Sequence, residues 1–284
     1  MVRDYLLPYV DLYLKTQLVK DPSWYTRESP YGIYFRDFYH RQYDVEDDKT
    51  NPRDPVKLEH LNKLWLGWNI GLSDLDILGR PRPITHLLYR LPRVRYKGQG
   101  SPAQSSAAKH RRAVSRVSRA TGQVDTFRFQ RVEMRKHLDR LRETHPMFRY
   151  HMDGKVPKKV YDREMTDAVI IPSPFGDGAT CYRDFEAILS GGVMLKADMG
   201  HLDMRPNFYI PGVTYIPHDW DFSDFAGKVL HILEHRSEYE AMARAAQQTY
   251  LKALSPEGGE DFALQFKEIV QEALARRSGS LRSA

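Results

Sequence analysis

The strongest constraint on the fold is the alternation of helical and strand patterns from Thr126 onward. AVIIPS (168–173) and VMLKAD (193–198) are short apolar runs flanked by Pro or Gly, which is typical of buried strands. VTYIP (213–217) has the same character. Helical patterns separate these runs, and strands that alternate with helices usually form a parallel sheet covered by the helices. We therefore predict an α/β fold with a Rossmann-like parallel sheet.

The helical patterns are amphipathic, as expected for helices that pack on a sheet. In segment 179–192, apolar side chains share one face and a Gly-Gly pair ends the pattern: Tyr182, Phe185, Ile188, Leu189, Gly191 and Gly192. Segment 223–254 is predicted as one long helix with an apolar side made of Phe225, Val229, Ile232 and Leu233. The other predicted helices cover 127–143, 157–167 and 261–277.

The first half of the chain has no clear period. Segments 7–18, 61–72 and 84–91 are apolar enough for core elements, but Pro, Asp and aromatic residues interrupt them, so their type stays open. Two complete doubly wound domains would strain a length of 284 residues. We expect an amino-terminal half over 1–125, reduced or incomplete, and a Rossmann-like domain over 126–284.

Charge and cysteine content narrow the class of protein. Lys and Arg number 43 against 37 Asp and Glu, so the net charge of +6 favours anionic partners. A single cysteine excludes an intramolecular disulfide and a zinc site of several thiolates. We expect a cytoplasmic protein, because no apolar run is long enough to span a membrane and the amino terminus lacks the layout of a secretory signal.

Segment 90–123 is rich in Lys and Arg and contains no acidic residue. We interpret its Ser-, Gly- and Ala-rich middle as a mobile surface loop. A peripheral contact with the inner face of a membrane is one alternative, and nucleic-acid binding is another. Aromatic side chains for base stacking are nearly absent from it, so nucleic acid is the less favoured partner.

The strand at 168–173 leads through a Gly-containing turn, 174–178, into a predicted helix that Thr180 could cap. Backbone N–H groups at such a helix start attract anions. Arg183 and Glu186 follow three residues apart on one helical face, where a cation suits a pyrophosphate and a carboxylate suits sugar hydroxyls. From spacing alone, a surface ion pair between Arg183 and Glu186 is an equal alternative.

The stretch SPFGDGATCYRDFEAILSGGVMLKAD, followed by VTYIPHDWDFSDFAGKVLHIL, resembles the donor-binding domain of GT-B glycosyltransferases. The likeness is to bacterial group 1-like and exostosin-like members, whose pattern is strand, Pro/Gly turn, Arg-x-x-Glu-Ala helix, small-Gly and strand. It covers roughly 126–250 well and the first half only loosely. The resemblance implies a nucleotide-sugar donor as co-substrate, no further cofactor, and an acceptor side in the first half.

Residue roles follow from this resemblance alone. It implies that Glu186 contacts the ribose and that Arg183 and Lys196 neutralise the diphosphate. The turn beside the diphosphate would include Gly176, Asp177, Gly178 and Thr180. Asp198 and His201, just past a strand end, are possible sugar contacts, although a lone histidine more often satisfies loop backbone groups.

The sequence departs from the pattern of retaining members. Their earlier glutamate corresponds here to Gly178, with Asp177 beside it, which leaves inversion possible and would require a general base from the first half. No pattern selects one among Asp11, Asp37, His40, Asp44, His60, Asp74 and Asp76. The catalytic residue is therefore unknown.

Two D-x-D patterns, at 74–76 and 219–221, match the way another transferase fold holds a metal. Such short patterns are common by chance, and Asp221 is better explained as a cap for the helix that opens at Ser223. No metal is expected at the donor site. Cys181 lies near a helix start, where a thiol pKa would be lowered, but its neighbours favour a packing role.

These features favour a metal-independent glycosyltransferase that acts on a glycan or lipid-linked acceptor in surface polysaccharide or glycoconjugate synthesis. A non-catalytic glycan- or nucleotide-binding module derived from such an enzyme is the alternative. A nucleic-acid-binding protein that acts through 90–123 is a weaker third possibility.

Overall fold

The computed structural model describes residues 2–47, 50, 52–69, 113–117, 124–152, 154 and 156–282, with side chains up to residue 278. The chain divides into two compact units. One consists of 1–70, 200–207 and 251–284, and the other of 71–199 and 208–250. The predicted segment 84–91 and the acidic residues Asp74 and Asp76 lie outside the described residues. The predicted domain boundary at residue 125 stays a prediction.

The second unit contains a five-stranded parallel sheet in the order β5-β4-β6-β7-β9. Its strands are β4 (Ala113–Val114), β5 (Arg149–Tyr150), β6 (Ala168–Pro172), β7 (Val193–Ala197) and β9 (Ile216–His218). Every residue of β6 and β7 is buried, since both faces of the sheet are covered. The predicted α/β fold with a parallel sheet covered by helices is confirmed.

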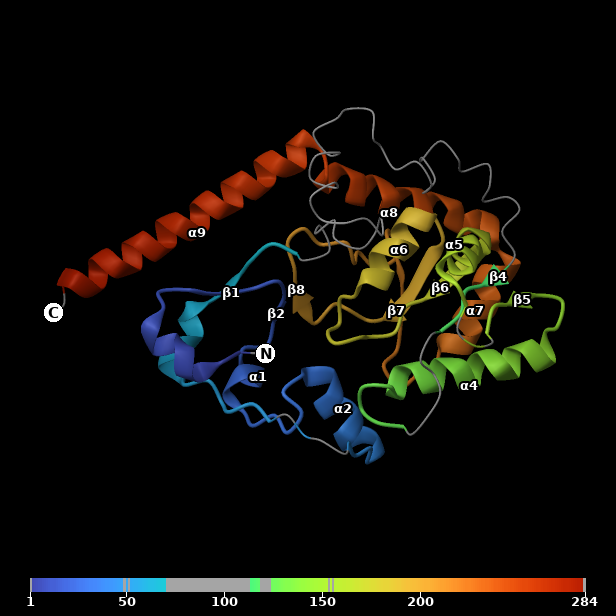
Figure 1. The fold of residues 1–284 in the computed structure, drawn as a ribbon, viewed down its shortest axis with the longest axis horizontal. Helices are drawn as coiled ribbons and strands as arrows, with labels where there is room; N and C mark the ends of the chain where they lie inside the picture. The colour runs from blue at the N-terminus through green and yellow to red at the C-terminus, as the bar shows by residue number, and fades with distance from the viewer. Residues whose placement is uncertain are drawn as a thin grey trace. The chain divides into compact units, whose positions relative to one another are not determined.

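Helices cover both faces of this sheet (Figure 1). The helices α4 and α7 pack together, and α7 contacts β6, whereas α6 packs on β7 and against α5. Their bounds are α4 (Phe129–Thr144), α5 (Lys158–Asp167), α6 (Tyr182–Ser190), α7 (Phe225–Glu234), the 3-10 segment η5 (Arg236–Tyr239) and α8 (Glu240–Ala253). The four apolar residues predicted to be buried on α7 are all buried.

Apart from the 27-residue helix α9, the first unit is built from short elements. A parallel pair joins β1 (Tyr13–Lys15) to β3 (Leu64–Leu66), and an antiparallel pair joins β2 (Leu18–Val19) to β8 (Leu202–Asp203). Val2, Leu7, Tyr25 and Val56 form a small core. The helical segments are η1 (Asp4–Tyr9), α1 (Ser23–Thr26), α2 (Tyr34–Tyr43), η2 (Leu58–Lys63) and α9 (Pro256–Arg282).

Two predicted element bounds were wrong. The helix predicted over 223–254 is broken after Glu234, because His235 leaves the helical region (φ −111°, ψ 31°). No side chain from 234 to 242 is buried, so packing does not hold a continuous helix there. The strand predicted from Val213 begins at Ile216, since 212–215 form a turn closed by the Gly212 N–H donating to Tyr215 O at 3.0 Å.

Two further predictions also differ from the structure. Tyr182 is 43% exposed, although it was predicted on the buried face of its helix. The last helix runs to Arg282 and is longer than predicted. Residues 113–117 of the basic segment 90–123 are buried and include β4, a strand too short to produce a period among basic residues. The Ser-, Gly- and Ala-rich middle of that segment, predicted as a surface loop, lies outside the described residues. In the described part of the chain, no helix is both long and apolar enough to cross a membrane.

Gly192, at the start of β7, marks a close approach of two strands. A Cβ there would lie 2.6 Å from Ile171 Cδ1 and 3.1 Å from the Ala168 carbonyl oxygen. We predict that Gly192→Ala lowers the free energy of unfolding by about 1–3 kcal/mol, because the core must shift to admit the methyl group. Urea unfolding followed by circular dichroism measures this.

Gly227→Ala is the matched control. Gly227 lies inside α7, and a Cβ there meets no atom within 4 Å. Alanine in a helix interior should raise the stability by about 0.5–1 kcal/mol. Equal effects of the two substitutions would contradict the packing argument.

Candidate functional site

The order of the strands defines where a ligand is expected. After β4 the chain runs through α4 to β5, on one side of β4, whereas after β6 it runs through α6 to β7, on the other side. The carboxyl ends of β4 and β6 are therefore neighbours whose connections diverge. Open α/β sheets bind ligands in the crevice at such a switch point.

Arg183, in the first turn of α6, joins the two strand ends at this switch point. Its Nε donates to Pro172 O, the end of β6, at 2.9 Å. Its Nη2 donates to Ser115 Oγ at 3.0 Å and to Arg116 O, both just past β4. Among the described residues no carboxylate pairs with Arg183, so its charge is surrounded by neutral oxygen atoms. The sequence predicted that Arg183 lies next to the turn after β6, but it did not predict the partners of Arg183.

Glu186 is engaged by α5. Its Oε2 accepts from the Tyr161 hydroxyl at 2.6 Å, and its Oε1 from Lys158 Nζ at 3.1 Å. Burial raises the pKa of Tyr161 above its ordinary value, so the hydroxyl remains a donor. The alternative of a surface ion pair between Arg183 and Glu186 is therefore not what the structure contains.

A small pocket of about 80 Å³ lies between α5 and α6 beside Glu186. Ligand pockets for molecules of drug size usually have about 300–1,000 Å³. This pocket is too small for a nucleotide-sugar. It is lined by Lys158, Tyr161, Asp162, Met165, Thr166, Glu186 and Ser190.

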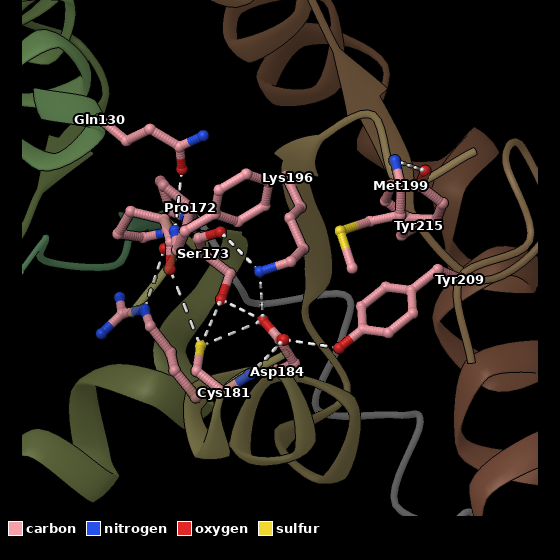
Figure 2. Close-up of polar contacts among 12 residues, drawn as sticks. Gln130, Pro172, Ser173, Cys181, Asp184, Lys196, Met199, Tyr209 and Tyr215 are labelled. Carbon is pink, nitrogen blue, oxygen red and sulfur yellow. Dashed lines mark hydrogen bonds and ion pairs between the residues drawn. The ribbon is translucent and has the colours of Figure 1, made fainter. Parts of the chain in front are cut away.

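Lys196, on β7, is buried together with Asp184 of α6 (Figure 2). Its Nζ lies 3.1 Å from Asp184 Oδ1 and donates to Ser173 O at 3.2 Å. The side chain of Lys196 is 0% exposed and that of Asp184 is 1% exposed. The Phe175 ring packs against the ammonium group, with its centroid 5.0 Å away. The predicted contact of Lys196 with a diphosphate stays a prediction, and here its charge is already balanced by Asp184.

Asp184 also fills the anion position at the start of α6. Its carboxylate accepts from the Cys181 N–H at 3.0 Å, from the Tyr209 hydroxyl at 2.6 Å and from Ser173 Oγ (Figure 2). The helix amino terminus thus holds an anion of the chain itself. Sequence analysis missed Asp184, although a residue three positions after a helix cap is where a capping box places an acid.

The turn after β6 is fixed by α4. Gln130 Oε1 accepts from the Phe175 N–H at 2.8 Å, and Arg131 Nη2 donates to Phe175 O at 2.9 Å. The Gly176 N–H donates to Gly178 O at 2.9 Å, and Asp177 is exposed at the tip. The sequence gave no signal for Gln130 or Arg131, because they lie on a helix far from the turn along the chain.

Thr180 was predicted as the helix cap, and this was wrong by one residue. The cap is Cys181, with Tyr182 as the first helical residue, because the Cys181 backbone is extended (φ −138°, ψ 161°). Burial raises the pKa of the Cys181 thiol, which is the opposite of the effect expected from a helix start. Thr180 lies within hydrogen-bonding reach of Tyr209.

The two possible sugar contacts fall in different units of the chain. Asp198, at the end of β7, accepts from the Tyr215 hydroxyl at 3.3 Å, and its carbonyl accepts from Trp220 Nε1 at 3.0 Å. His201 belongs to the first unit, and its ring packs on Tyr34 of the same unit with centroids 4.7 Å apart. Their proposed roles stay predictions.

Ordinary structural partners account for several other candidates. Asp221 accepts from the Ser223 N–H at 2.9 Å and closes a turn. Its predicted role as a helix cap was wrong, because α7 begins at Phe225 with Asp224 as its cap residue. Asp37 is buried and accepts from Tyr31 N at 3.1 Å, and His60 lies 3.3 Å from Asp4. No group of three or more His, Cys, Asp or Glu residues able to hold a metal ion occurs among the described residues.

The sequence analysis also did not predict a buried ion pair between Arg116 and Glu164, near Arg183. Arg116 donates to Glu164 through Nε at 2.6 Å and Nη2 at 2.7 Å, and these hydrogen bonds lower the pKa of Glu164. The pair ties the residue after β4 to α5. It leaves Arg183 as the cation of this crevice without a carboxylate partner among the described residues.

Comparison with known proteins adds little. No protein-family model matches the chain, and no curated protein matches its sequence. Among solved structures, it is similar to the crystal structure of Anabaena Alr3699/HepE in complex with UDP-glucose. The two are 12% identical with a TM-score of 0.37, over 79% of this chain and 58% of that chain. The chain thus spans less than two thirds of that protein, and a likeness of this extent does not assign a function.

We predict that Lys196→Met lowers the free energy of unfolding by about 3–5 kcal/mol, because it leaves the Asp184 carboxylate buried without a counter-charge. Urea unfolding measures this. The control is Lys136→Met, which removes an exposed pair with Glu133 and should cost less than about 1 kcal/mol. A loss of similar size in both variants would contradict the role given to the buried pair.

His218, at the carboxyl end of β9, gives a pH prediction. Burial lowers the pKa of His218 from its ordinary value of 6.5 to about 4, and its Nε2 has no hydrogen-bond partner among the described residues. Below pH 6.5 the unfolded chain binds a proton that the folded chain excludes, so stability falls as the pH drops from about 6.5 to about 4. The loss should reach about 3 kcal/mol.

Chemical denaturation at several pH values tests this, with His218→Gln expected to flatten the slope. His145→Gln, at the partly exposed end of α4, should keep the wild-type slope. An unchanged slope in His218→Gln would rule out this residue as the source of the pH dependence.

Proposed function

We propose that the chain is a metal-independent glycosyltransferase that binds a nucleotide-sugar at the switch point between β4 and β6. The proposed acceptor is a glycan or a lipid-linked sugar. The observation that carries the proposal is Arg183, a cation held only by neutral oxygen atoms at this position among the described residues. A cation without a carboxylate partner is suited to a diphosphate.

The geometry favours one side of the turn for the diphosphate. Asp184 already fills the start of α6 and balances Lys196, so a second anion there would be repelled. We therefore place the diphosphate on the Arg183 side, next to the turn from Gly176 to Thr180. Arg183 would stabilise the negative charge that develops on the departing nucleotide, and fixed positive groups of this kind contribute a large part of catalysis.

A non-catalytic nucleotide- or glycan-binding module is the second candidate, and one observation favours it. Lys196 is neutralised by Asp184, which leaves one cation fewer to stabilise a departing diphosphate. Such a module would bind the nucleotide without releasing it from the sugar.

The first test is calorimetric titration of the protein with UDP, GDP, CMP, ADP and dTDP and with their sugar conjugates. We predict that one nucleotide class binds and that Arg183→Gln weakens its binding at least about tenfold, because a charge-assisted hydrogen bond is lost. Glu186→Ala should weaken it as well. Lys136→Gln, on the exposed face of α4, is the control and should bind as the wild type does.

Arg183→Gln also removes hydrogen bonds within the protein, so a second variant tests the charge without disturbing the fold. Asp177 is exposed at the tip of the turn. Asp177→Asn removes a negative charge beside the proposed diphosphate and should strengthen binding, most clearly at low salt. Unchanged affinity in both variants would overturn the proposed site.

Release of the nucleotide diphosphate from the bound conjugate, in the presence of acceptor glycans, separates the two candidates. Turnover supports the transferase. Binding without turnover supports the module.

A further inference from the structure

Two exposed histidines lie at the carboxyl end of α7, at the opposite edge of the parallel sheet from the switch point. His231 and His235 lie four residues apart, and the His235 N–H donates to His231 O at 2.9 Å, so they stand one helical turn apart. Their ring centroids are 4.5 Å apart and the ring planes are tilted by 34°. Histidines at this spacing on one helical face can bind the same metal ion.

The Nδ1 atom of each ring has a partner from η5. The Tyr239 hydroxyl lies 2.9 Å from His231 Nδ1, and Glu238 Oε1 lies 3.2 Å from His235 Nδ1. An ionised carboxylate only accepts hydrogen bonds, so His235 Nδ1 carries the proton. A neutral His235 then has its lone pair on Nε2. In the described part of the chain, neither Nε2 atom makes a hydrogen bond or an ion pair.

This arrangement is the one that metal-binding histidines use. A histidine ligand usually binds through one nitrogen while its other nitrogen is held by a carboxylate or another polar group, which fixes the ring. Here both rings are held through Nδ1. Glu234 and Glu238 are exposed in the same stretch and add negative charge near the pair.

We propose that His231 and His235 together bind one divalent transition-metal ion through their Nε2 atoms. Imidazole ligands suit Zn²⁺, Cu²⁺ and Ni²⁺. The described residues contain no group of three or more metal-binding side chains, so water completes the coordination and the ion is exchangeable. Because η5 supplies the partners of both rings, a bound ion stabilises the corner between α7 and η5.

The proposed metal site is independent of the proposed nucleotide site. Helices that follow strands of a parallel sheet run antiparallel to them, so the carboxyl end of α7 lies at the amino edge of the sheet. Arg183 lies at the carboxyl edge. Loss of one site therefore leaves binding at the other unchanged.

The test is calorimetric titration of the full, metal-free chain with ZnCl₂ and with CuSO₄ at neutral pH. His231→Gln and His235→Gln should each weaken binding at least about tenfold, because each removes one of two ligands that act together. Glu238→Gln and Tyr239→Phe should weaken it about tenfold through the ring orientation. The rise in Tm that the ion gives the wild type should be lost in the same variants.

A matched control keeps the number of histidines. His235→Gln combined with Ser237→His places the second imidazole six residues from His231, on a different face, and should bind as weakly as His235→Gln alone. Acidification to pH 5.5 should release the ion, because protons compete for the imidazole nitrogen. Wild-type affinity in the His231→Gln/His235→Gln double variant, or in the control, would overturn the proposal.

Discussion

The second unit depends on one buried ion pair, Lys196 with Asp184. Removing a lysine and an aspartate from water costs several kcal/mol per ion, and this cost is recovered only when each charge is fully hydrogen-bonded. Asp184 meets this condition through Tyr209, Cys181 and Ser173, and Lys196 through the Ser173 carbonyl and the Phe175 ring. The pair therefore fixes β7, the loop after β6 and the start of α6 relative to one another.

This pair also determines which charges remain for a ligand. The start of α6 and Lys196 were both expected to bind a phosphate. Asp184 instead occupies the helix start and pairs with Lys196. At the neighbouring strand end the balance is different, because Arg116 pairs with Glu164 while Arg183 is held by neutral oxygens. At the same sheet edge, Lys196 and Arg116 are thus neutralised by carboxylates. Arg183 has no carboxylate partner among the described residues, and it is therefore a cation that remains available to the proposed anionic ligand.

The sequence predicted the sheet well where burial is complete. AVIIP is apolar throughout and VMLKA is apolar except for Lys196, so both can be recognised as buried strands from the sequence alone. It failed for β4, whose two residues lie among basic and polar neighbours. The sequence also failed to predict the end of α7 before His235. The amphipathic pattern continues past this point, although no buried side chain there holds a continuous helix.

For the site, the sequence found residues but not their partners. The strand, turn and helix around 168–190 are local, so Arg183 was placed correctly at the mouth of the turn. Its bonds to Ser115 and Arg116 connect positions 68 and 67 residues apart, and only the strand order brings these together. The same holds for Lys196 and Tyr209, which reach Asp184 from separate elements. Because charge compensation depends on these long-range contacts, the resemblance implied the same role for Lys196 and Arg183.

The difference between a cation that is compensated and one that is not is therefore the structural criterion for function here. A buried lysine paired with an aspartate has already lost its hydration and gained its partner, so a ligand would have to compete with Asp184 for it. In the described part of the chain Arg183 makes no such pair, and a diphosphate would add charge-assisted hydrogen bonds without displacing a carboxylate there. Gly178, which stands where retaining members of the resembled family have a glutamate, also favours an anion here. A glutamate at this position would add negative charge beside the proposed diphosphate. Along this edge, Arg183 is the group that favours an anion, and exposed Asp177 is the nearby group that opposes it.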